Sequence, residues 1–405
     1  MRAVVYRGVN DLRLETVPVP RIGANELLVR VAVCGVCPTD IKKIQYGTVP
    51  PPRIFGHETA GTIVQIGSQK SEGGRKKSHS ALRTPHSEFR LGDRVALHHH
   101  VPCLDCHFCR HHAFAQCETY KRTGITAGFE PAGGGYAEYV RVMPFVLPGV
   151  VKIPAKNSFA EGAMLEPVNT VLKAVRRLSV LRGDVVLVAG QGPIGLMFTR
   201  LLQLAGVRVI ATDLLPSRLK LARQFGARWA VLVSNFQLST APRMPSGINS
   251  QLAARGLDAA VIAVPSDAAV HQAMQLIRCG GQVLLFAHTK RSEVRSQKPE
   301  ARNLRSDIRS QKSGFRPPTS AFSLQPSAFS LDLASICVDE KDLLGSYSSD
   351  FTLQREVARI VFSRQLDVRP LLTHEFPLGQ TAAAIRLASR PTEDSLKILV
   401  RADDV

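Results

Sequence analysis

The sequence has no long apolar run, and this limits what the protein can be. No stretch approaches the roughly 18 consecutive apolar residues of a membrane span, and the mean hydropathy is +0.00. The N-terminus does not show a charged start, an apolar core and a small-residue cleavage site, so we expect no secretory signal peptide. We therefore expect a cytoplasmic protein without membrane contact.

Acidic residues are also scarce. There are 33 of them against 52 lysines and arginines, which gives a formal net charge of +19. Such a surplus could indicate nucleic-acid binding, but residues 70–90 contribute +4 of it and residues 290–316 contribute +6. The second segment repeats itself, because residues 291–298 recur with small changes fourteen positions later. We interpret both segments as low-complexity insertions, at about 68–88 and about 289–330, and do not expect nucleic acid as a partner.

Cysteines are few and clustered, which argues against a disulfide framework. The chain has eight, and Cys103, Cys106, Cys109 and Cys117 form a Cys-x2-Cys-x2-Cys-x7-Cys pattern. Four thiolates this close can surround one Zn²⁺ tetrahedrally and leave no open position, which is typical of a structural site. An iron–sulfur cluster is the weaker alternative.

A second set of metal-binding side chains is spread over a longer stretch. Cys37 is followed twenty positions later by His57 and Glu58, and a thiolate, an imidazole and a carboxylate are ligands of catalytic zinc sites. Glu166 lies in the apolar segment 162–167, where an ionised carboxylate is costly unless a metal or hydrogen bonds satisfy it. Taken alone, each fragment is more often structural, and the sequence leaves open whether Glu58 or Glu166 would be the third ligand.

A run of histidines flanks the cysteine cluster and could suggest a second metal ion. The flanking histidines are His98, His99, His100, His111 and His112. Solvated loop histidines are the more common explanation of such a pattern, so we expect these side chains to be exposed to solvent.

A glycine-rich loop stands at the start of an α/β pattern. Residues 184–190 form an apolar run of strand length, and residues 196–205 have a helical pattern. Between them lies Gly-x-Gly-x-x-Gly, with Gly190, Gly192, Pro193, Ile194 and Gly195 as candidate cofactor-binding residues. In this context the backbone N–H groups at a helix N-terminus can hold a pyrophosphate.

The next predicted strand, residues 207–212, ends in Asp213. This residue lies 23 positions after Gly190, about where a carboxylate accepts the hydroxyls of the adenosine ribose and repels a 2′-phosphate. We therefore expect NAD rather than NADP. Arg218 is the main argument for NADP, because a nearby arginine can bind that phosphate.

The remaining pattern predicts an α/β protein in two parts. Short alternating runs in residues 1–66 indicate a small barrel-like β domain, and strands and helices then alternate as in a doubly wound parallel sheet. We expect a β-rich catalytic domain at 1–155, a cofactor domain at 156–364 and a C-terminal segment at 365–405 that returns to the first domain.

Together, these motifs resemble the zinc-containing medium-chain dehydrogenase/reductase family, and are most similar to its sorbitol- and L-threonine-dehydrogenase-type members. The resemblance covers nearly everything outside the two insertions. It implies a GroES-like catalytic domain, a Rossmann NAD-binding domain, one catalytic and one structural Zn²⁺, and a homo-oligomer (a dimer or tetramer). The four clustered cysteines match the family's structural zinc lobe.

The resemblance also assigns roles at the catalytic site. Cys37 and His57 match the first two zinc ligands, with Glu58 as the neighbouring carboxylate. Glu166 matches an acidic residue that binds the metal or approaches it through water. Thr39 matches a hydroxyl that passes the substrate proton onward.

Lys42 departs from the family's pattern. The family usually has a histidine three residues after the relay hydroxyl, and a lysine could act in that place only if its pKa were lowered.

The predicted function is oxidation of a secondary alcohol, with hydride transfer to NAD. One alternative is an NADPH-dependent carbonyl or quinone reductase, many of which would be expected to lack the zinc ligands present here. Another is a zinc-stabilised binding protein whose basic insertions hold nucleic acid or an acidic partner, in which case binding would weaken steeply with salt and survive deletion of the glycine-rich loop. Polyols, sugars, hydroxy amino acids and simple alcohols all remain open as substrates, because the pocket is shaped by residues from both domains.

Overall fold

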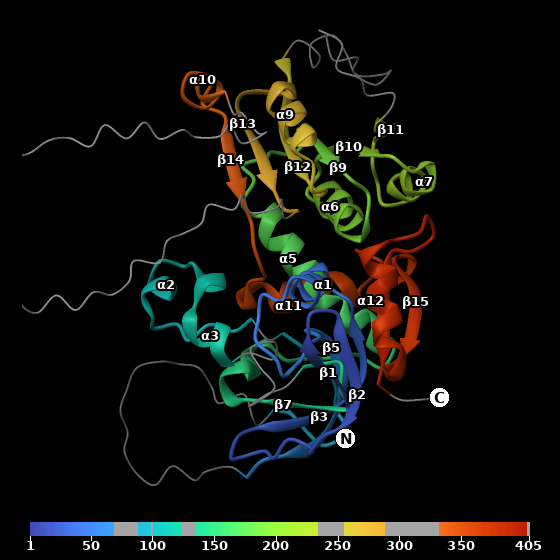
Figure 1. Cartoon of the computed structure of the whole chain (residues 1–405). Helices are drawn as coiled ribbons and strands as arrows, with labels where there is room; N and C mark the ends of the chain where they lie inside the picture. Colours follow the sequence, from blue (N-terminus) through green and yellow to red (C-terminus); the bar gives the residue numbers. More distant parts are fainter. Residues whose placement is uncertain (69–87, 99, 124–133, 234–254, 288–331, 403–405) are drawn as a thin grey trace, which may run out of the picture.

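Three sheets organise the chain. The computed structural model describes residues 1–68, 88–98, 100–123, 134–233, 255–287 and 332–402. Within them, one sheet has three strands, one has seven and one has six. Figure 1 shows the six-stranded sheet above the other two, with α5 (Leu165–Val175) running between them. No helix among the described residues is both long and apolar enough to cross a bilayer.

The N-terminal part of the chain is rich in antiparallel strands. The small sheet has the order β2-β1-β4, and the larger one has the order β15-β16-β3-β5-β6-β8, with β7 also paired to β3. The strands are β1 (Arg2–Gly8), β2 (Asp11–Thr16), β3 (Leu27–Gly35), β4 (Arg53–Ile54), β5 (Glu58–Ile66), β6 (Arg94–Leu97), β7 (Tyr139–Val142), β8 (Val151–Lys152), β15 (Leu372–Pro377) and β16 (Lys397–Arg401). Strand β16 pairs with β3, so residues near the C-terminus complete a sheet begun before residue 36.

The six-stranded sheet is entirely parallel. Its order is β11-β10-β9-β12-β13-β14, which is the strand order of a doubly wound dinucleotide-binding fold. The strands are β9 (Val185–Ala189), β10 (Arg208–Asp213), β11 (Trp229–Leu232), β12 (Leu257–Ile262), β13 (Ile277–Leu285) and β14 (Asp342–Gly345). The predicted α/β class is therefore confirmed.

Helices cover both parts. They are α1 (Pro38–Tyr46), α2 (His107–Arg110), α3 (Glu118–Thr123), α4 (Phe159–Ala163), α5, α6 (Pro193–Leu204), α7 (Pro216–Gln224), α9 (Asp267–Leu276), α10 (Leu333–Cys337), α11 (Gln354–Phe362) and α12 (Thr381–Ser389). Short 3-10 turns are η2 (Phe114–Gln116), η3 (Pro144–Gly149), η5 (Phe351–Leu353), η6 (Arg369–Leu371) and η7 (Leu378–Gln380). Helix α4 begins with a capping box, in which Ser158 and Glu161 satisfy each other's backbone N–H groups.

The β-rich part, which contains β1–β8, β15 and β16, and the parallel-sheet part, which contains β9–β14, share an apolar core. One cluster of buried side chains contains Val33 and Ala60 of the seven-stranded sheet together with Val186 and Leu196 of the parallel-sheet part. Burial of such a continuous apolar surface is the main term that holds packed elements together. The core therefore joins the β-rich part to the parallel-sheet part.

Element boundaries differ from the prediction most clearly at one junction. The sequence pattern predicts a helix over 268–278 and a strand from 282, but α9 ends at Leu276 and β13 begins at Ile277. Ile277 already has extended backbone angles, so the helix passes into the strand without a loop. Most of the two proposed insertions lies outside the described residues, and the domain boundaries at 155 and 364 stay a prediction.

Candidate active site

Three side chains that could bind a metal meet where α1 and β5 begin. The ligand atoms of Cys37, His57 and Glu58 lie within 4.8 Å of one another. Cys37 is the N-cap residue of α1, and Glu58 opens β5 opposite Gly35 of β3. His57 and Glu58 are buried, whereas Cys37 is half-buried. This group, called the metal trio below, has the donor set of a catalytic zinc site.

His57 is held by a carboxylate that the sequence analysis did not single out. Asp40 is fully buried, and its Oδ2 lies 3.1 Å from His57 Nδ1. A histidine that ligates a metal usually donates its other ring N–H to such a carboxylate, which fixes the ring. Burial lowers the pKa of His57, but the charges of Asp40 and Cys37 outweigh this and raise that pKa well above its ordinary value. A divalent cation bound by the trio would replace the proton that these negative groups attract.

Glu58 has a cationic partner from near the C-terminus. Lys397 of β16 forms an ion pair with Glu58, and the two side chains are 7% and 2% exposed. Lys397 Nζ also donates to Val36 O at 3.1 Å. Gly35 makes room for the pair, because a Cβ there would overlap with Glu58 Oε2 and lie 3.0 Å from Lys397 Cε. Burial raises the pKa of Glu58, and Lys397 opposes that rise.

Glu166 lies beside the metal trio but has a different contact. It is buried in the first turn of α5, and its Oε1 lies 3.3 Å from His100 Nδ1. Among the described residues, the ligand atoms that gather within 4.8 Å include Glu58 and not Glu166. The choice between Glu58 and Glu166 as the third ligand stays a prediction.

The prediction that the histidines are solvated is wrong for His98 and His100. His98 is 0% exposed, and the side chain of His100 is 11% exposed. Ser349 Oγ lies 2.8 Å from His100 Nδ1 and 3.4 Å from His98 Nε2. Burial lowers the pKa of His98 to about 4 and that of His100 well below its ordinary value. The segment after β6, which carries His98 and His100, therefore lies in the interior between the β-rich part and the parallel-sheet part. The imidazoles of both residues are neutral there.

The other histidines have different outcomes. His111 and His112 are exposed, as predicted, and His99 lies outside the described residues.

The four clustered cysteines have the spacing of a zinc site. The sulfurs of Cys103 and Cys109 are 3.9 Å apart, those of Cys106 and Cys109 are 3.5 Å apart, and those of Cys117 and Cys103 are 3.6 Å apart. Four sulfurs at the ~2.3 Å zinc bond length around a tetrahedral ion would be about 3.8 Å apart. The backbone N–H groups of Asp105 and Cys106 lower the pKa of Cys103 to about 6. The lobe therefore fits Zn²⁺ held by four thiolates.

The glycine-rich loop joins β9 to α6. Gly190 has a φ of +91°, which favours glycine. Gly192 is the N-cap residue of α6, and Pro193 and Ile194 begin its first turn. A Cβ at Gly195 would overlap with Gly190 O, so only glycine lets the helix pack this closely on the strand. The loop presents a helix N-terminus at the carboxyl edge of the parallel sheet, where dinucleotides bind.

Asp213 and Arg218 lie next to this loop. The carboxylate of Asp213 accepts hydrogen bonds from Gln191 N at 2.6 Å and Leu215 N at 2.9 Å. Arg218 is 8% exposed, and its Nη2 donates to Ser395 O at 2.6 Å. Asp213 is thus fixed at the end of β10, and Arg218 connects α7 to the C-terminal segment.

Thr39 and Lys42 lie three residues apart on α1, about one helical turn, so they share a face beside the metal trio. Thr39 is half-buried. Burial lowers the pKa of Lys42 from its ordinary value. The shift is in the direction that a lysine needs to exchange protons near neutral pH.

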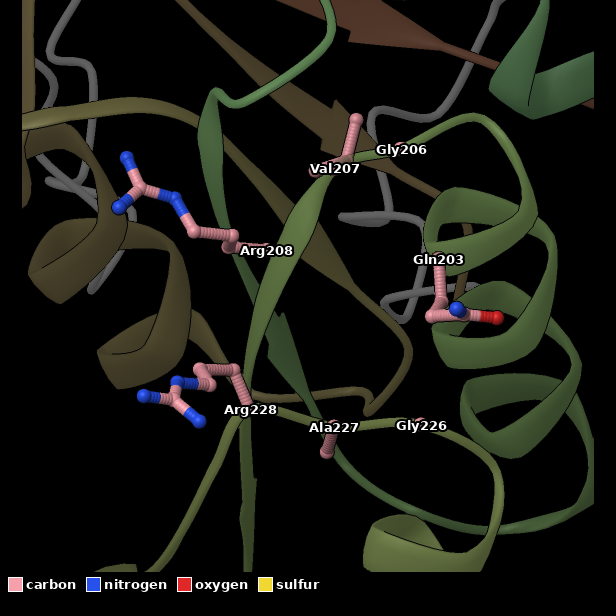
Figure 2. A pocket seen from close by; sticks show the side chains of 7 residues that line it. All are labelled: Gln203, Gly206, Val207, Arg208, Gly226, Ala227 and Arg228. Carbon is pink, nitrogen blue, oxygen red and sulfur yellow. The ribbon is translucent and has the colours of Figure 1, made fainter.

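A surface pocket of about 350 Å³ lies elsewhere on the parallel sheet. Figure 2 shows its lining, in which Arg208 and Arg228 stand at the starts of β10 and β11. Because the glycine-rich loop follows the end of β9, this pocket lies at the opposite edge of the sheet. We therefore do not assign it to the cofactor or the substrate.

Comparison with known proteins supports this arrangement. The model of the alcohol dehydrogenase GroES-like domain matches residues 23–155, and that of the zinc-binding dehydrogenase matches residues 193–315. The chain is 25% identical to the sorbitol dehydrogenase of Bacillus subtilis (strain 168), over 99% of this chain and 97% of that protein.

Two solved structures have the same fold. A zinc-binding dehydrogenase from Sinorhizobium meliloti 1021, bound to NADP, has a TM-score of 0.76 at 24% identity, with 99% of this chain and 98% of that chain covered. The 2R,3R-butanediol dehydrogenase from Bacillus subtilis has a TM-score of 0.71 at 21% identity, with 99% of each chain covered. The predicted combination of a GroES-like part and a Rossmann part is confirmed.

Proposed function

Because the chain belongs to the zinc-containing medium-chain dehydrogenase/reductase family, we propose that it oxidises a polyol or a related secondary alcohol with NAD⁺ as the hydride acceptor. The family and its relatives make the protein a zinc-dependent alcohol or polyol dehydrogenase that uses NAD(P). The observation that carries the assignment of the site is the convergence of Cys37, His57 and Glu58. A reductase without zinc would not need this buried donor set.

We assign the metal trio to the catalytic ion and the cysteine lobe to the structural ion. Zn²⁺ in the trio would supply Lewis-acid chemistry at the substrate oxygen. Asp40 orients His57, and Lys397 holds Glu58 in place. This preorganisation lets the ligands keep one geometry throughout the reaction.

Thr39 and Lys42 are assigned to the proton path. The Thr39 hydroxyl passes the proton of the substrate hydroxyl onward, and neutral Lys42, one helical turn further along α1, accepts it. The Gly190–Gly195 loop would hold the pyrophosphate of the dinucleotide, whose nicotinamide would supply the hydride acceptor. Asp213 supports NAD as the preferred form, because its carboxylate would repel a 2′-phosphate.

We also propose a homo-oligomer that works in the cytoplasm. Within the described part of the chain, β14 ends the parallel sheet and leaves an edge that a second copy could extend. None of the eight cysteines forms a disulfide bond, which agrees with a reducing compartment.

A substrate screen with metal analysis tests the proposed function. We expect two zinc ions per chain, and NAD⁺ reduction with polyols above that with sugars, hydroxy amino acids or simple alcohols. NAD⁺ is expected to support a higher kcat/KM than NADP⁺. A metal-free protein that is inactive with all four substrate classes would refute the assignment, whereas carbonyl reduction with NADPH alone would favour the reductase alternative.

Replacing Lys42 with histidine is expected to move the pH profile. A proton acceptor works in its neutral form, so kcat/KM should rise with pH through the pKa of Lys42. Histidine has an ordinary pKa of about 6.5. The rise of kcat/KM with pH should therefore occur at least about one pH unit lower in Lys42→His than in the wild type. The measurement is kcat/KM from pH 5.5 to 10, with Lys220→His on the exposed side of α7 as the control. An unchanged profile in Lys42→His would remove this lysine from the mechanism.

A further inference from the structure

The side chain of Gln191 is buried, although this residue stands in the middle of the glycine-rich loop. Its Nε2 donates to Val188 O of β9 at 2.9 Å, and Thr199 Oγ1 of α6 donates to its Oε1 at 3.0 Å. Gln191 and Thr199 are both 0% exposed. This set of contacts, which ties the loop to β9 and to α6, is called the Gln191 brace below. The roles assigned so far to the loop do not use it.

The residues next to the Gln191 brace are apolar. Val188 and Phe198, the residue before Thr199, both belong to the core shared by the β-rich part and the parallel-sheet part. A buried amide or hydroxyl costs free energy unless its hydrogen bonds are made, and a matched pair of apolar side chains would fill the same space without that cost. A buried polar pair with satisfied hydrogen bonds instead favours one conformation over its alternatives. The brace therefore contributes a fixed position for the loop more than it contributes burial.

The glycine-rich loop needs such support. Gly190, with a φ of +91°, and Gly192 flank Gln191 on either side. Glycine has more conformational freedom to lose on folding than any other residue, so a segment with two glycines is easily displaced unless further contacts hold it. Of the six residues from Gly190 to Gly195, only Gln191 has a polar side chain. It is therefore the residue of the loop whose side chain can hold the backbone by directed hydrogen bonds.

The backbone of Gln191 leads from the brace to Asp213. The N–H of Gln191 donates to Asp213 Oδ2 at 2.6 Å, and that of Leu215 donates to Oδ1 at 2.9 Å. A carboxylate oxygen can accept more than one hydrogen bond, so each oxygen keeps a position for a ribose hydroxyl. The direction of these positions depends on where the Gln191 N–H lies, and the brace fixes that place.

We propose that Gln191 is a positioning residue for cofactor selection, which acts through Asp213 and is held by Thr199 and Val188. This inference rests on the proposed preference for NAD. A carboxylate in a fixed orientation accepts the ribose hydroxyls of NAD and repels the 2′-phosphate of NADP. A carboxylate that is free to turn loses hydrogen bonds to the first and moves away from the second. Loss of the brace should therefore weaken NAD binding and discrimination together, without changing the chemical step.

Gln191→Met tests the proposal, because methionine has a similar length but makes neither hydrogen bond of the brace. The ratio of kcat/KM for NAD⁺ over NADP⁺ is expected to fall about 10-fold, the size of effect that one lost hydrogen bond produces. Calorimetric titration should show a similar increase in the Kd of NADH. The kcat at saturating NAD⁺ should stay close to that of the wild type, because the metal trio and Thr39 are unchanged.

Gln354→Met is the matched control. Gln354 of α11 is 1% exposed, and its Oε1 accepts from Asn169 Nδ2 at 3.1 Å. The substitution removes a buried, hydrogen-bonded amide in the same way, but outside the glycine-rich loop. We expect a lower Tm in both variants, whereas Gln354→Met should keep the wild-type cofactor ratio and the wild-type Kd of NADH.

A double variant separates positioning from stability. Gln191→Met leaves the Thr199 hydroxyl buried without its acceptor, and adding Thr199→Val removes that hydroxyl. Replacing both partners by apolar groups of similar shape restores stability, so the Tm of the double variant should lie above that of Gln191→Met. The cofactor ratio should stay low, because the loop is still without its brace. A merely structural role predicts that the ratio recovers together with the Tm.

The outcomes separate this inference from the proposed function. If the wild type prefers NADP⁺, or reduces neither cofactor, the proposed function fails. The brace is then judged by titration alone, in which Gln191→Met should still bind NADH more weakly than Gln354→Met does. If the wild type prefers NAD⁺ but Gln191→Met keeps the wild-type ratio and NADH affinity, the inference is refuted and the proposed function stands. Recovery of both quantities in the double variant would refute it equally.

Discussion

Replacing Cys37 with alanine is expected to lower kcat/KM about 10⁴-fold, the largest change in activity that the structure predicts. The thiolate is one of three side chains that meet within 4.8 Å, and two ligands hold an ion much more weakly than three. Losing Lewis-acid stabilisation of several kcal/mol corresponds to a decrease of this size. The measurement combines steady-state kinetics with zinc analysis, in which we expect the content to fall from two ions per chain to one.

Cys34 provides the matched control. It is three positions away in sequence and fully buried, and burial raises the pKa of its thiol to about 12, so it stays protonated. Cys34→Ala should keep both zinc ions and most of the activity, with a small loss of stability from the cavity. Binding of NAD⁺ should survive in both variants, because neither residue lies in the glycine-rich loop. Full activity and two zinc ions in Cys37→Ala would contradict the assignment of the trio.

Replacing Cys109 with serine is expected to destabilise the protein most. The sulfurs of Cys109 and its neighbours have the spacing of a tetrahedral zinc site, and a structural zinc ion contributes its binding free energy to folding. We expect one zinc ion to be lost and the Tm to fall by about 10 °C or more. Scanning calorimetry and zinc analysis of the same sample measure both effects.

The control for the lobe is Cys279→Ser. Cys279 is an exposed thiol outside the lobe, and we expect neither the Tm nor the zinc content to change. A Cys109→Ser protein with two zinc ions and the wild-type Tm would show that the lobe does not hold the structural ion.

The sequence was most informative for sites whose residues lie close together in the chain. The glycine-rich loop and the four clustered cysteines lie within short stretches, so spacing alone indicates what they can bind. Asp40 is a residue of the site that the local sequence could also have indicated. It lies three residues after Cys37 in the first turn of α1, close enough to support a ligand, but a lone aspartate in a helix is usually solvated.

Contacts between distant segments could not be predicted in the same way. Lys397 contacts Glu58 only because β16 pairs with β3, and Ser349 reaches His100 only because the two parts of the chain pack together. The histidines illustrate the limit most clearly. A polar run is usually solvated, and only packing shows that His98 is buried.

The pairing of β16 with β3 also has a consequence for how the enzyme matures. On the ribosome, the strand that carries Lys397 emerges after nearly every other residue of the site, so the growing polypeptide has to keep Glu58 without its cation while the parallel sheet can already fold. The site can therefore reach its full geometry, with Glu58 paired, only after translation has passed residue 401.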